Sequence, residues 1–76
     1  MHHLHQIVFC PTSKRWHAYE EQVYCCPIHI GDSISIRIKD RYFQAQVERD
    51  TQWYISIEDE KFRLHPKQKY DVILLF

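Results

Sequence analysis

Four side chains of this 76-residue chain carry groups that bind zinc readily. They are the thiols of Cys10, Cys25 and Cys26 and the imidazole of His29. Zinc-binding cysteines usually form pairs separated by two residues, but two of these cysteines are adjacent and the third is distant. We therefore expect no resident metal or cofactor, and these four residues are weak candidates for a structural zinc site. The alternative is that a cysteine packs in the core and the histidine lies at the surface.

Other histidines lie near the N-terminus. His3 and His5 alternate along a predicted strand, so they share one of its faces, and we expect His17 on the neighbouring strand of the same hairpin. The simplest interpretation is a solvated strand face. The alternative is that these imidazoles contribute to a zinc site.

A cysteine near a histidine also raises the question of nucleophilic catalysis, because a thiolate beside a base is a strong nucleophile. Cys25, Cys26 and His29 are close in sequence. However, the chain contains no nucleophile-elbow motif or comparable signature, and so short a chain encloses little of a substrate. We predict that the protein is not an enzyme.

A third group of side chains suits the recognition of another molecule. These residues are rich in arginine, tyrosine and amide groups, which supply hydrogen-bond donors and flat stacking surfaces. The predicted partner-binding residues are Arg37, Lys39, Tyr42, Gln44, Gln46, Tyr54 and Arg63. The alternative is an ordinary solvated face of an antiparallel sheet.

The elements that position this face follow from a period of two in the hydrophobic pattern. Residues 33–39 and 42–48 each alternate apolar with polar side chains, which is typical of half-buried strands. A tight turn at Asp40–Arg41 joins them. The predicted register pairs Ile38 with Phe43, Ile36 with Ala45 and Ile34 with Val47.

The same pattern continues along a central meander that spans residues 33–64. A strand at 52–57 pairs with the previous one through Val47 and Trp53, and a short strand at 62–64 pairs through Ile57 and Phe62. The predicted core face of the meander consists of Ile34, Ile36, Ile38, Phe43, Ala45, Val47, Trp53, Ile55 and Ile57.

The two ends of the chain complete the predicted domain, which spans residues 1–76. Residues 4–24 read as a hairpin, in which 18–22 form either strand or a helical turn, and the apolar run 72–76 reads as a buried strand. We predict an all-β fold of six or seven short strands, as a small antiparallel barrel or a strongly bent sheet. An SH3-like barrel is the first choice, and an open meander with an added hairpin is the second.

Several short motifs resemble a family of small bacterial proteins of unknown function, found mainly in Firmicutes and often on mobile elements. The motifs are Arg15-Trp16, Cys26 five residues before Gly31-Asp32, Ala45-Gln46-Val47-Glu48 and Trp53-Tyr54-Ile55. The extra histidines, the doubled cysteine and the lack of other glycines depart from the family pattern. The resemblance implies a bacterial or phage setting and carries over no activity.

Composition limits the partners and the compartment. Ten basic residues balance ten acidic ones, which weakens a general nucleic-acid binder, because such proteins usually carry excess positive charge. The odd number of cysteines and the absence of a signal peptide or long apolar run favour a cytoplasmic protein with no membrane contact.

Together these observations predict a non-enzymatic protein-interaction module. The setting implied by the resemblance adds the expectation that it inhibits a host protein, in the manner of a phage or mobile-element anti-CRISPR protein. The alternative is a small nucleic-acid-binding barrel that uses Tyr and Arg side chains on one sheet face. A homodimer formed through a strand edge or through 72–76 is a further expectation.

Overall fold

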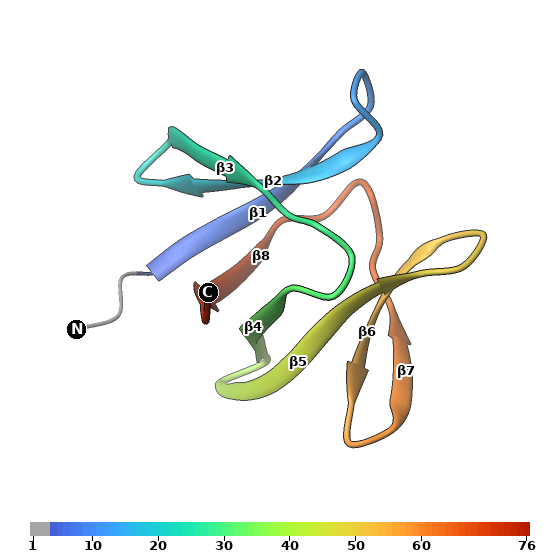
Figure 1. Ribbon diagram of the computed structural model, residues 1–76. Helices are drawn as coiled ribbons and strands as arrows, with labels where there is room; N and C mark the ends of the chain where they lie inside the picture. Colours follow the sequence, from blue (N-terminus) through green and yellow to red (C-terminus); the bar gives the residue numbers. More distant parts are fainter. Residues whose placement is uncertain (1–3) are drawn as a thin grey trace.

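A computed structural model describes residues 4–76 and shows a single antiparallel sheet with no helix in that range (Figure 1). His3 lies outside the described residues. The strands are β1 (Leu4–Cys10), β2 (Arg15–Glu20), β3 (Val23–Pro27), β4 (Ser33–Ile38), β5 (Arg41–Arg49), β6 (Trp53–Ile57), β7 (Glu60–Arg63) and β8 (Tyr70–Leu74). The all-β prediction is therefore confirmed, with eight strands in place of six or seven.

The order of the strands shows that the sheet is open. It runs β3-β2-β1-β8-β4-β5-β6-β7, so the C-terminal strand β8 lies between β1 and β4 and joins the two halves of the chain. Closure would need a ladder between the outer strands β3 and β7, and the described residues form none. The expected SH3-like barrel is therefore not what the structure shows. Strands β1, β2 and β3 lie on one side of β8, and β4 to β7 lie on the other side. The outer strands β3 and β7 therefore form the two open edges of the sheet.

The N-terminal half contains one more strand than the sequence pattern predicted. The second strand of the hairpin predicted for 4–24 ends at Glu20, and Glu21 and Gln22 form a two-residue turn with positive φ angles of 49° and 69°. Positive φ at both central residues is the pattern of a type I′ hairpin turn. Residues 18–22 thus form strand and β-turn, and the helical-turn alternative is wrong.

The registers of the central hairpins differ from the predicted ones by two residues. Ile36 pairs with Phe43, in place of Ile38, and Val47 pairs with Ile55. The first turn lies at Lys39–Asp40, with Lys39 at a φ of 59°, so β5 begins at Arg41. A shift by two residues keeps every side chain on its predicted face, because side chains alternate with a period of two.

The core consists of apolar side chains on one face of the sheet. Among the described residues the buried ones are Ile7, Trp16, Ala18, Ile28, Ile34, Ile36, Ala45, Val47, Ile55, Ile57, Leu64 and Val72. Ile38, Phe43 and Trp53 are partly buried against this cluster. The predicted core face of the meander is therefore confirmed, although three of its members lie at the margin.

The connection from β3 to β4 links the two halves of the sheet. The Ile28 amide donates to the Trp16 carbonyl at 2.8 Å, and the Gly31 amide donates to the Val47 carbonyl at 2.7 Å. Gly31, with a φ of 95°, takes a conformation that side chains disfavour. Residues 4–76 hold no helix of the length and hydropathy needed to cross a membrane.

Candidate functional site

Six of the seven predicted partner-binding residues lie on the outward face of β4–β7, Lys39 lies in the β4–β5 turn, and all seven are exposed or half-buried. The two-residue shift changes which of them are neighbours. The predicted register would align Arg37, Gln44, Ser56 and Arg63 in one row across the four strands, and the observed register does not form that row. Arg37 instead lies opposite Tyr42, and Tyr54 lies opposite Arg63. The predicted surface therefore divides into a β4–β5 part and a β6–β7 part.

In the β6–β7 part, the cations are held by one carboxylate. Arg63 donates from Nη1 to Asp50 Oδ1 at 2.7 Å and from Nη2 to Oδ2 at 3.1 Å, and Lys61 Nζ lies 3.0 Å from Oδ2. The hydrogen bonds from Arg63, the Gln52 amide and Lys61 hold the pKa of Asp50 well below its usual range. The Tyr54 ring lies beneath Lys61 and Arg63, 4.5 Å and 5.6 Å from its centroid. We call Asp50, Tyr54, Lys61 and Arg63 the Asp50 cluster.

The arginine of the β4–β5 part is also engaged within the protein. Arg37 Nη1 lies 3.2 Å from Asp71 Oδ2 on β8, and its Nε donates to the Lys39 carbonyl at 2.8 Å. Gln6 on β1 donates to the other Asp71 oxygen at 3.2 Å. These contacts join β1, β8 and β4, so Arg37 contributes to the fold as well as to the surface.

Next to Gln44, the ladder between β5 and β6 ends early. Its last pair is Gln46 with Ser56, although β5 continues to Arg41. Beyond this pair, β6 and β7 form a hairpin that diverges from β5 (Figure 1). The space between them is a cleft of about 470 Å³. Its lining residues are Ser33, Phe43, Gln44, Ala45, Gln46, Ser56, Ile57, Glu58 and Asp59. We call this cleft the β5 opening.

The four weak zinc candidates do not converge among the described residues. No three of them have ligand atoms within reach of one another. Hydrogen bonding to Ser13 lowers the pKa of Cys10, whereas burial raises the pKa of Cys26, which packs against the core. His29 Nδ1 lies 3.8 Å from an Asp32 oxygen in the β3–β4 connection.

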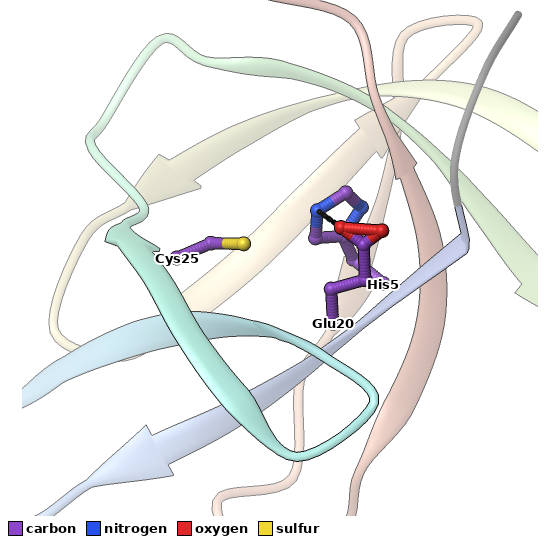
Figure 2. A group of neighbouring side chains, drawn as sticks. All are labelled: His5, Glu20 and Cys25. Atoms are coloured by element: carbon purple, nitrogen blue, oxygen red, sulfur yellow. Dashed lines mark ion pairs between the residues drawn. The ribbon is translucent and has the colours of Figure 1, made fainter.

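A different group that includes one of these cysteines does converge. His5, Glu20 and Cys25 each place one ligand atom within 4.8 Å of the other two, and His5 Nε2 is 3.9 Å from Glu20 Oε1 (Figure 2). We call these three residues the His5 cluster. Sequence analysis named His5 and Cys25 in separate groups and missed Glu20. The register of the β1–β2 hairpin was the signal that could have joined His5 to Glu20.

The other histidine of this hairpin, His17, lies on β2. His17 pairs with Val8, whereas core-facing Ile7 pairs with Ala18, so His17 points to the opposite face from His5. There its ring packs edge-on against Tyr24 at 5.2 Å between centroids, and its Nε2 lies 3.1 Å from Ser13 Oγ. His17 therefore lies on the neighbouring strand β2, as expected, but on the opposite face from His5.

Comparison with known proteins identifies a family without an assigned activity. Residues 5–74 match the model of a domain of unknown function, DUF5348. No curated protein matches the chain, and no solved structure matches it. The match supports the family resemblance seen in the sequence, but it carries neither the taxon nor the mobile-element link.

Proposed function

This chain belongs to the DUF5348 family, whose function is unknown, and we propose that it is a non-enzymatic module that binds an extended protein segment. The segment would add as a strand to β5 within the β5 opening. The observation that carries the proposal is the early end of the β5–β6 ladder, which leaves Gln44 without a ladder partner on β6 among the described residues.

The backbone of Gln44 has the orientation that strand addition needs. Along an antiparallel strand, successive residues direct their N–H and C=O groups to opposite sides. The Val47 amide bonds toward β4, by donating to the Asp32 carbonyl at 2.9 Å, while Gln46 pairs with Ser56 on β6. Gln44 therefore directs both backbone groups toward the β6 side. An incoming strand can satisfy one donor and one acceptor there.

The side chains around the opening indicate the chemistry of the segment. Gln44 and Gln46 supply amides, and Phe43 and Ile57 supply apolar contact area. The turn residues Glu58 and Asp59 line one end, both with positive φ. We expect a segment that alternates apolar and polar residues and carries a basic side chain near this turn.

The alternative function, nucleic-acid binding, has less support. Its proposed cations are Arg37, Lys39 and Arg63, and the two arginines are held by Asp71 and Asp50. A phosphate would have to compete with these carboxylates, and the chain carries no net charge to attract it. The expected inhibitory role comes from the sequence resemblance alone and is not part of the proposal.

A peptide selection tests strand addition directly. Random peptides displayed on phage are selected on the immobilised chain, and the dissociation constants of the selected peptides are measured by fluorescence anisotropy. Gln44→Pro removes the N–H that faces the opening, so we expect it to weaken binding about tenfold or more. The matched control, Gln44→Ala, keeps the N–H and should bind much more tightly than the proline variant.

A second arm leaves the protein unaltered. N-methylation of alternate backbone amides in the selected peptide should abolish binding in one alternating set and spare it in the other, because a strand presents every second amide to its neighbour. The proposal would be overturned if methylation of either set of peptide amides weakened binding equally. It would also be overturned if Gln44→Pro bound the peptide as tightly as the unmodified chain, or if the selection enriched no peptide.

A further inference from the structure

Three side chains from three different strands meet at one end of the β1–β3 hairpins. His5 comes from β1, Glu20 ends β2, and Cys25 lies in β3 (Figure 2). His5 and Glu20 are cross-strand neighbours, because the adjacent residues Gln6 and Tyr19 pair with each other. The His5 side chain is 11% exposed and that of Glu20 is 39% exposed. A small solute can therefore reach the cluster from one side.

We propose that the His5 cluster binds one Zn²⁺ ion, with solvent as the fourth ligand. An imidazole, a thiolate and a carboxylate form a mixed nitrogen, sulfur and oxygen donor set, which suits zinc and disfavours magnesium and calcium. Three protein ligands with one open position are an established arrangement for tetrahedral zinc.

The distances are close to those that tetrahedral coordination requires. With metal–ligand bonds of about 2.0–2.3 Å, neighbouring ligand atoms in a tetrahedron lie about 3.3–3.7 Å apart. The His5–Glu20 pair is already at 3.9 Å, and every pair is within 4.8 Å. Coordination would require these separations to shorten by at most about 1.5 Å.

A β-bulge brings the thiol to this side of the sheet. Ala18 pairs with Cys26 and Tyr19 pairs with Tyr24, so Cys25 is the extra residue where the register shifts. In a regular strand, adjacent cysteines would point to opposite faces. Here Cys26 packs against the core, while the Cys25 sulfur still points toward His5 and Glu20 (Figure 2). Because of the bulge, the two adjacent cysteines both direct their thiols to the same face of the sheet, at different positions.

Bound zinc would fasten an outer strand of the sheet. Within the described residues β3 forms ladder hydrogen bonds with β2 alone, and coordination through Cys25 would tie it to β1 as well. Binding forms a metal–sulfur bond and releases the thiol proton to solvent.

The test uses the full-length, metal-free chain and Zn²⁺ itself. We expect isothermal titration calorimetry to show one zinc ion per chain. The melting temperature should rise by roughly 10 °C at a zinc concentration about a hundred times the dissociation constant. With Co²⁺ as a spectroscopic substitute, a sulfur-to-cobalt charge-transfer band should appear, because one ligand is a thiolate.

Two near-isosteric variants test the proposed ligands without creating a cavity in the core. Loss of a residue that only hydrogen-bonds to a metal ligand weakens metal binding about 10–100-fold. Replacement of a ligand itself, in Cys25→Ser or Glu20→Gln, should therefore weaken zinc binding by more than about 100-fold. The matched controls Cys10→Ser and His29→Gln should bind zinc as the unmodified chain does. Unchanged affinity in Cys25→Ser or Glu20→Gln would overturn the proposal. So would loss of binding in a His2→Gln/His3→Gln double variant, which would assign the ion to the N-terminal histidines.

Discussion

The two polar clusters differ in the kinds of side chain that they bring together. In the Asp50 cluster, one carboxylate faces the guanidinium of Arg63 and the ammonium of Lys61, so anion and cations are both supplied by the chain. In the His5 cluster, the three converging side chains all offer electron pairs, and none of the three is a lysine or arginine. The first cluster pairs opposite charges within the chain, whereas the second brings together three groups that can each donate an electron pair to a metal ion.

The clusters also have a common role in the architecture, because each includes a residue of an outer strand. Lys61 and Arg63 belong to β7 and reach back to Asp50 in the β5–β6 loop. Cys25 belongs to β3 and reaches toward His5 on β1. Edge strands have neighbours on one side only, so side-chain attachments matter more there than in the middle of a sheet. Each outer strand therefore carries a side chain that points back to a more central part of the sheet, an ion pair in β7 and a metal-ligating group in β3.

The largest expected effect comes from the core that supports both clusters. Trp16 is fully buried, packs edge-on against Phe9 and Tyr70, and carries the carbonyl that accepts from the Ile28 amide. Trp16→Ala should lower the free energy of unfolding by about 3–5 kcal/mol, measured by urea denaturation. Such a loss would unfold much of so small a domain and remove both clusters together.

The control for this prediction is an exposed apolar residue of the same half. Val23→Ala changes a side chain that is 67% exposed, and we expect the free energy of unfolding to change by less than about 0.5 kcal/mol. If Trp16→Ala unfolded one outer strand and spared the other in amide hydrogen exchange, the two clusters would not depend on a common core.

An intermediate effect is expected from the Asp50 cluster. Asp50→Asn removes the charge that Arg63 and Lys61 share, so amide exchange in β7 should accelerate while exchange in β3 stays unchanged. The pKa of Asp50 is lowered in the folded chain, so its carboxylate stabilises the fold above the ordinary pKa of about 3.9. That stabilisation is lost progressively as the pH falls below about 4, because the carboxylate of the unfolded chain then binds a proton while that of the folded chain stays ionised.

Thermal melts across this pH range measure the contribution. The melting temperature of the unmodified chain should fall more steeply below about pH 4 than that of Asp50→Asn. Asp40→Asn, at the exposed β4–β5 turn, makes the same change in charge and should keep the steep fall. Parallel curves for the unmodified chain and Asp50→Asn would show that the network does not stabilise the fold.

The smallest effect is expected at the His5 cluster when metal is absent. Glu20→Gln is nearly isosteric, and Glu20 is half-buried on the last residue of β2. With a chelator present, the free energy of unfolding should change by less than about 0.5 kcal/mol, as measured by urea denaturation. A larger loss would mean that this carboxylate stabilises the fold without a metal, as Asp50 does.

The sequence by itself predicted the strand faces, because alternation with a period of two follows directly from the pleat of a strand. Ile34, Ala45 and Ile55 are buried as expected, and Gln44 and Gln46 face outward. The same alternation is unchanged by a shift of two residues, so it could not distinguish the predicted pairing of Ile36 with Ala45 from the observed pairing with Phe43. The turn conformation at Lys39 decided that register.

The tertiary structure alone decided which chemistry-bearing residues meet. The sequence supplied thiols, imidazoles and arginines, but their grouping depends on pairings between distant strands. Glu20 reaches His5 through the register of β1 and β2, and Cys25 joins them through a bulge that no alternation pattern predicts. The early end of the β5–β6 ladder is likewise a property of the folded sheet. Local pattern determines the face of a side chain, whereas register, bulges and strand ends determine its neighbours.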